Sequence, residues 1–230
     1  MPVLKASGIS RRNPRARDWL LRGVSLELLR GDRLVISGPS GAGKTVLLRA
    51  LALLDPLDVG TIHWNGGPLR CEAIPSFRSQ VVYLHQRPAL FEGSVEENLE
   101  HPYSLNVYGG RRFDRDRVVD LLNDLGRAEP FLDKLARDLS GGEGQILALL
   151  RAIQLDPTVL LLDEPTASLD RDTTRAIERL IDRWFTERPG ARALIWISQD
   201  PGQARRVANR ALWMQAGQLE PGHRYEAYLS

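Results

Sequence analysis

One segment constrains the fold of this chain more than any other feature: Gly38-Pro39-Ser40-Gly41-Ala42-Gly43-Lys44-Thr45. A strand pattern at Leu34 to Ser37 precedes it, and residues 45–54 follow with leucines at helical spacing. This order of strand, glycine-rich turn and helix is the pattern of a phosphate-binding loop. A plain strand-to-helix turn would need neither Lys44 nor Thr45 at those places. We therefore expect a nucleotide-binding α/β fold.

The residue types of this loop fit phosphate chemistry. Glycines let consecutive backbone N–H groups curl around phosphate oxygens, and the start of the following helix adds a positive dipole end. Lys44 would reach the outer phosphates, and Thr45 would offer its hydroxyl to Mg²⁺. The expected ATP-binding residues are therefore the eight residues of this loop.

Patterns of strands and helices alternate along most of the chain. Residues 95–155 show several helical patterns and no convincing strand, which predicts a helical insertion. Strands alternating with helices predict a parallel sheet covered on both faces. The expected strands span 24–29, 34–37, 61–64, 81–84, 159–162, 193–198 and 211–214, and the expected helices span 45–54, 118–125, 145–153, 171–185 and 201–208.

Composition excludes several classes of protein. The 230 residues include 31 Lys+Arg and 29 Asp+Glu, which gives a net charge of +2. This charge is too small to indicate the basic surface that a dedicated nucleic-acid-binding protein needs. The longest apolar runs fall far short of the roughly 20 residues that a membrane span needs. No secretory signal is recognisable at the N-terminus. Cys71 is the only cysteine, which suits a reducing cytoplasm.

A second motif carries two adjacent carboxylates. An apolar strand at 159–162 ends in Asp163-Glu164-Pro165, at the sheet edge where ligands bind in open α/β folds. Asp163 could hold Mg²⁺ through water, and Glu164 could deprotonate a water in line with the γ-phosphate. A solvated strand end before a proline turn is the alternative for this piece taken alone.

A third motif is Leu139-Ser140-Gly141-Gly142-Glu143-Gly144-Gln145. Ser140 and Glu143 form the capping box of a helix. Capping does not require two glycines in the first turn, where each costs up to roughly 1 kcal/mol relative to alanine. The glycines therefore suggest that another group approaches the backbone closely.

Together these motifs resemble the ATP-binding subunit of an ABC (ATP-binding cassette) transporter, and the resemblance covers nearly the whole chain. Its parts appear in the order of the family: Walker A at 38–45, the Q-loop glutamine Gln86, the signature at 139–145, Walker B at 159–164 and the D-loop at 167–170. The resemblance implies a P-loop NTPase of the ABC ATPase type, with a RecA-like core, an N-terminal antiparallel β subdomain and a helical subdomain. We expect one domain over 1–230, with the core at 1–86 and 156–230 and the helical signature subdomain at 87–155.

The resemblance also implies roles for single residues. Glu164, Gln199 and Gln86 would serve catalysis, Thr45, Gln86 and Asp163 would hold Mg²⁺, and Asp170 would act in the D-loop. The signature residues Ser140, Gly141, Gly142, Glu143 and Gln145 would act across a head-to-tail dimer on the ATP of the other chain. ATP would join a homodimer or pseudo-symmetric dimer, and hydrolysis would drive a separate transmembrane permease subunit from the cytoplasmic face of the membrane.

The sequence departs from the family at three places. Gln199 stands where the family usually has a histidine that contacts the γ-phosphate, so we expect slowed rather than abolished hydrolysis. No aromatic residue occupies the usual adenine position, where Arg11 could stack through its guanidinium plane and Trp19 is the other candidate. Gly144 and Ile146 replace polar or basic residues after the signature.

The transported substrate is the least constrained inference. The single-cassette layout, the compact insertion and the ending Tyr225-Glu226-Ala227-Tyr228 are most similar to small bacterial ATPases linked to iron or other metal efflux. Phosphate-importer ATPases are an alternative, and so is an ATP-gated regulatory module with a weakened site. A soluble cassette ATPase acting on DNA or ribosomes usually carries a coiled coil or a second cassette, for which this chain has no room.

Overall fold

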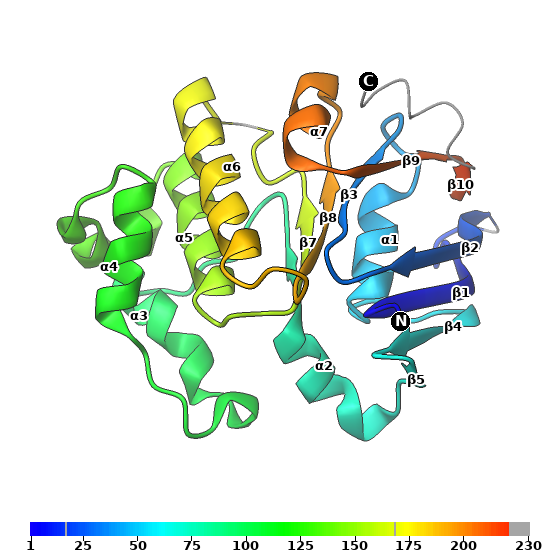
Figure 1. The fold of residues 1–230 in the computed structure, drawn as a ribbon, viewed down its shortest axis with the longest axis horizontal. Helices are drawn as coiled ribbons and strands as arrows, with labels where there is room; N and C mark the ends of the chain where they lie inside the picture. Colours follow the sequence, from blue (N-terminus) through cyan, green and yellow to red (C-terminus); the bar gives the residue numbers. More distant parts are fainter. Residues whose placement is uncertain (17, 168, 221–230) are drawn as a thin grey trace. The chain divides into compact units, whose positions relative to one another are not determined.

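The computed structural model describes residues 1–16, 18–167 and 169–220. The elements, drawn in Figure 1, are β1 (Leu4–Arg12), β2 (Trp19–Leu28), β3 (Arg33–Ser37), α1 (Lys44–Leu51), β4 (Val59–Trp64), β5 (Gly67–Pro68), α2 (Ile74–Gln80), β6 (Val81–Leu84), α3 (Val95–Glu100), α4 (Arg115–Asp124), α5 (Gly141–Ile153), β7 (Val159–Asp163), α6 (Arg171–Thr186), β8 (Ala193–Ile197), α7 (Pro201–Val207), β9 (Arg210–Gln215) and β10 (Gln218–Glu220). Short 3-10 turns lie at Cys71–Ala73, His101–Ser104, Asn106–Tyr108, Glu129–Asp133 and Ala136–Asp138.

The chain packs as two compact units. Unit 1 takes Met1–Tyr83, Thr158–Glu164 and the chain from Pro189 onward, and unit 2 takes Leu84–Pro157 and Pro165–Arg188. Unit 2 thus holds α3 to α6, and α6 groups with the helical insertion. Unit 1 holds the sheets and α1.

Unit 1 contains two sheets. One has the order β2-β1-β4-β5 with antiparallel neighbours, and the other has the order β10-β9-β3-β8-β7-β6. In the second sheet β9, β3, β8 and β7 run parallel, and β10 is an antiparallel addition beside β9. This pair of sheets confirms the expected fold class, a nucleotide-binding core with an N-terminal antiparallel β subdomain.

An apolar cluster lies within unit 1. Leucines of α1 (Leu47, Leu48 and Leu51) are fully buried in it, together with apolar residues of both sheets. The helical spacing of these leucines buries one face of α1 against β7 and β2. Because the phosphate loop leads directly into α1, this packing fixes where the loop stands.

The sequence pattern missed β1. Its burial does not alternate along the strand, and its pairings with β2 and β4 shift register around Gly8. A strand with such irregularities lacks the period-2 signal on which sequence-based prediction depends. Its formation depends on partners that lie far away in the sequence.

The helix predicted at 45–54 is shorter than expected, because α1 ends at Leu51. Leu53 adopts a left-handed backbone with φ 55°, and the Leu54 N–H donates to the Arg49 carbonyl at 2.9 Å. This is the hydrogen-bond pattern of a Schellman cap, which usually has glycine at the left-handed position. Because leucine occupies this position instead of glycine, the end of the helix was not predicted.

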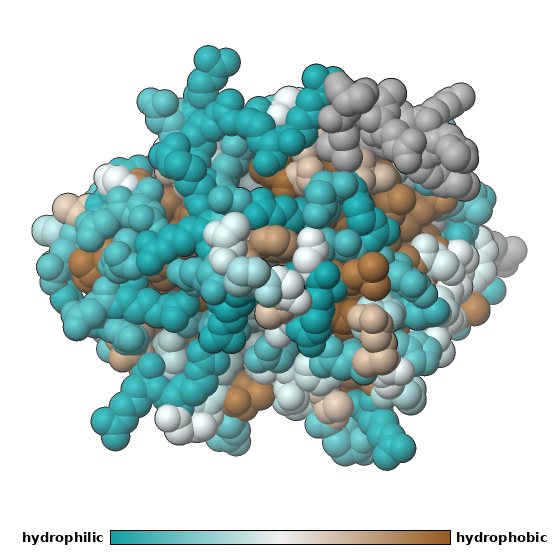
Figure 2. All heavy atoms as spheres, viewed as in Figure 1, coloured by the Kyte–Doolittle hydropathy of each residue, from teal (hydrophilic) through white to brown (hydrophobic). Residues whose placement is uncertain are grey.

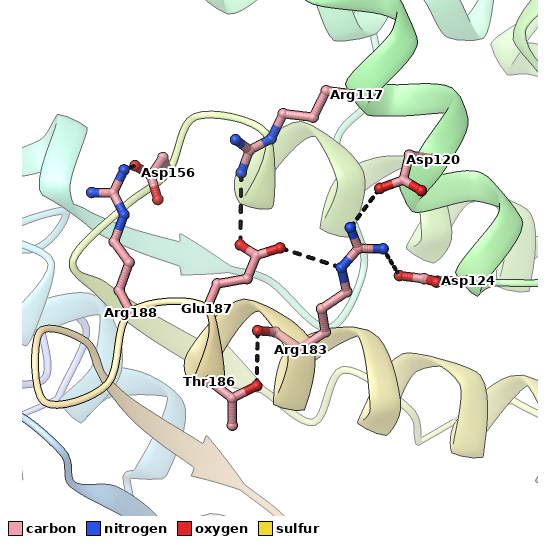
Figure 3. Close-up of polar contacts among 8 residues, drawn as sticks. All are labelled: Arg117, Asp120, Asp124, Asp156, Arg183, Thr186, Glu187 and Arg188. Carbon is pink, nitrogen blue, oxygen red and sulfur yellow. Dashed lines mark hydrogen bonds and ion pairs between the residues drawn. The ribbon is translucent and has the colours of Figure 1, made fainter.

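A charged network joins helices within unit 2 (Figure 3). The Arg183 guanidinium of α6 contacts Asp120 and Asp124 of α4, and its Nε lies 3.2 Å from Glu187. Arg117 lies 4.0 Å from the same Glu187 carboxylate. Figure 3 also shows Arg188 paired with Asp156 at the two points where the chain leaves unit 2. One guanidinium therefore ties α4 to α6 through two carboxylates.

Arg183→Met should lower the free energy of unfolding by about 1–2 kcal/mol, because it leaves two aspartates of α4 without their shared cation. The value is small because the Arg183 side chain is 37% exposed and water screens its pairs. Thermal unfolding should show a fall in Tm of about 2–8 °C for a chain of this size. Arg179→Met, an exposed arginine of the same helix, is the control, and an equal fall for both variants would contradict the role of the network.

Hydrophilic residues cover most of the face shown in Figure 2, with apolar residues visible in small areas between them. Among the described residues, no helix combines the length and the apolar character that a membrane-spanning segment requires.

Candidate functional site

The phosphate-binding loop joins β3 to α1, as the sequence predicted. Gly38, Gly41 and Gly43 have φ values of 150°, 78° and 102°, a region that side chains disfavour. A Cβ at Gly38 would lie 2.0 Å from the Met214 carbonyl oxygen, and one at Gly43 would lie 2.8 Å from the Leu20 carbonyl oxygen. The loop is thus packed against β9 and β2, and only glycine fits at those two positions.

Lys44 lies inside this loop. Its Nζ donates to the carbonyl oxygens of Gly38 at 2.7 Å and Pro39 at 3.0 Å, and the residue is only 8% exposed. Burial lowers the pKa of the Lys44 ammonium, and the carboxylates of Glu164 and Asp163 oppose that shift. A desolvated ammonium within a ring of backbone groups is suited to bind an anion.

The Asp163 carboxylate receives two hydroxyl groups. Thr45 Oγ1 donates to Asp163 Oδ1 at 3.1 Å, and Tyr83 Oη donates to Asp163 Oδ2 at 2.8 Å. Asp163 itself is 3% exposed. Burial is the main reason that the pKa of the Tyr83 phenol is raised, and the Asp163 charge adds to it. The structure therefore brings Thr45 and Asp163, two of the three expected Mg²⁺ ligands, to one place.

These residues fit a magnesium ion. A threonine hydroxyl and an aspartate carboxylate are the hard oxygen ligands that Mg²⁺ takes in nucleotide sites. They lie within hydrogen-bonding distance of each other, at the first turn of α1 and the end of β7. Nucleotide phosphate oxygens would have to complete the coordination, because Mg²⁺ is usually held by one or two carboxylates plus phosphates.

Glu164 and Gln199 meet at the carboxyl ends of neighbouring parallel strands. Gln199 Nε2 donates to Glu164 Oε1 at 2.8 Å, and Asp163 is paired with Ile197 in the register of β7 and β8. Glu164 has a φ of 46°, an uncommon backbone conformation for a glutamate. Such strain costs about 1–3 kcal/mol and clusters at functional sites. The geometry thus presents a carboxylate that is oriented by an amide.

The expected signature residues begin α5 in unit 2. Ser140 caps the helix, accepting from the Glu143 N–H at 3.2 Å, while Glu143 accepts from the Ser140 N–H at 3.0 Å. Lys134 Nζ lies 2.7 Å from Glu143 and is the main reason that the pKa of the Glu143 carboxyl is lowered. Gln145 is buried in the same helix.

The two signature glycines differ in their surroundings. A Cβ at Gly142 would lie 3.1 Å from Leu169 Cδ2, so packing within the chain explains that glycine. A Cβ at Gly141 would meet nothing within 4 Å among the described residues. Packing within the described chain therefore does not explain Gly141, which leaves its backbone open to an outside group.

Asp170 and Gln86 also lie in unit 2. The Asp170 carboxylate caps α6, accepting from the Thr173 N–H at 2.9 Å and the Thr173 hydroxyl at 2.7 Å, and these bonds lower its pKa. Gln86 follows β6 by two residues and is exposed. Ser168 of the expected D-loop and the Tyr225–Tyr228 ending lie outside the described residues.

The expected adenine contacts occupy different environments. Arg11 Nη1 donates to the Pro56 carbonyl at 2.8 Å, and its Nη2 lies 3.6 Å from Asp55, which also pairs with Arg49. The Arg12 guanidinium instead lies 4.8 Å from the centroid of the Trp19 ring. Both candidates therefore have contacts within the chain, and the choice between Arg11 and Trp19 as the residue that stacks on adenine stays a prediction.

Tyr83 is the functional candidate that sequence reasoning missed. Its only signal was one hydroxyl within the apolar strand Val81–Leu84. Strand propensity accounts for a tyrosine there without any role in a site. The contact with Asp163 joins residues 80 positions apart and is visible only in the fold.

Comparison with known proteins agrees with this geometry. The family described as ABC transporter matches residues 21–167, which is more than half of the chain. Protein STAR1 of Oryza sativa subsp. japonica is 35% identical over 95% of this chain, and the chain spans 62% of that protein. Phosphate import ATP-binding protein PstB 2 of Natronomonas pharaonis is 35% identical over 87% of this chain and 73% of its own length.

A further relative is similar to this chain along almost its whole length. Probable iron export ATP-binding protein FetA of Escherichia coli is 32% identical over 90% of both chains. The dimeric structure of MJ0796, a bacterial ABC transporter cassette, has the same fold, with a TM-score of 0.83 and 24% identity over 95% of this chain and 97% of the other. This chain therefore belongs to the ABC transporter family, as an ATP-binding subunit of the ATPase type that powers transport.

Proposed function

We propose that this chain binds Mg²⁺-ATP and hydrolyses it within a head-to-tail dimer, at the inner face of the membrane, to drive a separate transmembrane subunit. The observation that carries the proposal is the Glu164–Gln199 pair, which stands at the strand ends beside Asp163 and the phosphate-binding loop. Nucleotide binding without hydrolysis would not require a strained, oriented glutamate at the end of β7. We propose the same roles for the remaining site residues as the sequence predicted.

The residues of unit 1 divide the work of hydrolysis. Gly38 to Thr45 bind and orient the phosphates, and the Lys44 ammonium offsets their charge. Thr45 and Asp163 would hold Mg²⁺, which would neutralise charge that develops on the phosphate oxygens. Glu164 accepts the proton of the attacking water. Gln199 donates to Glu164 and holds that carboxylate in place, a role that an amide fills without becoming cationic.

The dimer proposal is supported by the signature helix. Its first turn leaves backbone N–H groups at a helix start, which favours an anion. Gly141 has open space where a side chain would stand. The ATP held by a second copy, or by a homologous cassette, is the anion that the family resemblance implies, and the MJ0796 cassette is dimeric.

The pH profile of turnover tests the proposed catalytic pair. An imidazole at position 199 would titrate near pH 6.5, whereas the native amide does not titrate. We expect turnover of Gln199→His to fall by up to about tenfold between pH 8 and 6 relative to wild type, because an imidazolium beside Glu164 makes that carboxylate a weaker base. Steady-state phosphate release measures this difference.

The control is Gln218→His, which places an imidazole on β10, away from the strand ends that carry Glu164. Its profile should follow that of the wild type. Parallel profiles for Gln199→His and wild type would mean that residue 199 does not act on the catalytic carboxylate.

For the transported substrate we propose iron or another metal ion, moved outward. The similarity to FetA, which spans 90% of both chains, supports this choice. Phosphate import is the second candidate, supported by the 35% identity to PstB 2. Cells without this chain should accumulate metal and take up phosphate normally, and the reverse pattern would favour the importer.

A further inference from the structure

A tyrosine hydroxyl takes part in the proposed metal site without being a metal ligand in it. Tyr83 Oη donates to Asp163 Oδ2 at 2.8 Å, and Thr45 Oγ1 donates to the other carboxylate oxygen at 3.1 Å. The two donors come from different elements, β6 and the first turn of α1. Together they hold both oxygens of one buried carboxylate.

Packing alone does not require the hydroxyl. The Tyr83 ring is partly buried against the apolar cluster of unit 1, which a phenylalanine ring would fill equally well. The hydroxyl extends beyond that cluster to a carboxylate that is 3% exposed. A buried charge without donors is strongly unfavourable, so this bond has an electrostatic function beyond filling space.

The position of the bond suggests what it does. Thr45 is expected to coordinate the metal, so its hydroxyl serves both the ion and Asp163. Tyr83 contacts the carboxylate from the neighbouring strand and has no expected contact with the ion. Groups that hydrogen-bond a ligating carboxylate fix its orientation, and their removal typically lowers metal affinity by about 10–100-fold.

We infer that Tyr83 is a positioning residue, which orients the Asp163 carboxylate for the divalent cation that accompanies ATP. This inference rests on the proposed Mg²⁺-ATP site. It assigns to β6 a part in metal binding that neither the sequence motifs nor the glycine-rich loop account for. In this role the hydroxyl would act on the metal through Asp163, to which it donates at 2.8 Å.

Binding of Mn²⁺ in place of Mg²⁺ tests the inference without a turnover assay. The free Mn²⁺ signal in electron paramagnetic resonance, measured with the purified chain and the non-hydrolysable β,γ-imido analogue of ATP, gives the metal affinity. For Tyr83→Phe the apparent Kd for Mn²⁺ should rise by about tenfold. Its affinity for the analogue in EDTA should stay within about twofold of wild type.

The matched control is Tyr108→Phe, which removes the hydroxyl of a buried tyrosine in unit 2 and should leave the Mn²⁺ affinity unchanged. Thermal unfolding of both variants shows whether they are folded. An unchanged Mn²⁺ affinity in Tyr83→Phe would overturn the inference. An equal loss of metal and of metal-free nucleotide would also overturn it, since that result indicates a general structural role.

Asp163→Asn separates failure of the inference from failure of the proposed function. If wild type binds Mn²⁺ no better than Asp163→Asn, the proposed metal site itself is contradicted. The other outcome is that wild type binds Mn²⁺ well, Asp163→Asn does not, and Tyr83→Phe binds it as well as wild type. That result would contradict only the role of Tyr83. Retained affinity in 3-fluorotyrosine-substituted protein, where the hydroxyl persists, is the expected rescue.

Discussion

Glu164→Gln should lower steady-state ATP turnover by about 100- to 10,000-fold, the range that a positioned general base contributes. The amide has nearly the same shape as the carboxylate but does not accept a proton from water. Glutamine can adopt the backbone conformation of residue 164, so the strained turn after β7 should persist. ATP binding should therefore survive, and phosphate release over time measures the loss of chemistry alone.

The matched control is Glu92→Gln, an exposed glutamate of unit 2, which should leave turnover within about twofold of wild type. Turnover of Glu164→Gln within tenfold of wild type would show that another group takes the proton. The same variant also reports on the dimer, because ATP that is not hydrolysed should keep two copies joined. Sedimentation with Mg²⁺-ATP should show dimers of Glu164→Gln at concentrations where wild type returns to monomers.

The sequence predicted the parts of the site that lie close together along the chain. The phosphate-binding loop has its glycines, lysine and threonine within eight consecutive residues. The Asp163-Glu164 pair follows an apolar strand directly. Local spacing determines both motifs, so no knowledge of distant contacts was needed.

Long-range contacts account for what the sequence missed. Arg11 is engaged by Asp55 and the Pro56 carbonyl, some 45 positions away, and Tyr83 reaches Asp163 across 80 positions. Neither partner can be recognised from residue type. The same holds for β1, which forms through pairing with β2 and β4 despite its irregular burial.

Gln199 lies between these two cases. The sequence revealed the substitution, and the structure revealed its consequence, a hydrogen bond to Glu164 at 2.8 Å. Because the amide orients the carboxylate, the missing histidine need not remove hydrolysis. Glu164 also has a strained backbone, with a φ of 46°, and such strain clusters at functional sites.

Gly38→Ala should lower ATP affinity by about 100-fold, which corresponds to about 2.8 kcal/mol. The added Cβ would lie 2.0 Å from the Met214 carbonyl oxygen, a separation that forces either the loop or β9 to move. Gly38 also supplies the carbonyl to which Lys44 donates at 2.7 Å. Displacement of the loop would therefore disturb the backbone N–H groups and the ammonium together, and equilibrium titration with a fluorescent ATP analogue measures the loss.

Gly31→Ala separates this clash from backbone strain. Gly31 has a φ of 89°, and a Cβ there would meet nothing within 4 Å, so the substitution adds strain without a collision. We expect it to lower stability by about 1 kcal/mol and to leave ATP affinity within about twofold. Equal losses of affinity in both variants would mean that general destabilisation is responsible. A selective loss in Gly38→Ala would show that close packing of the loop against β9 is what shapes the phosphate site.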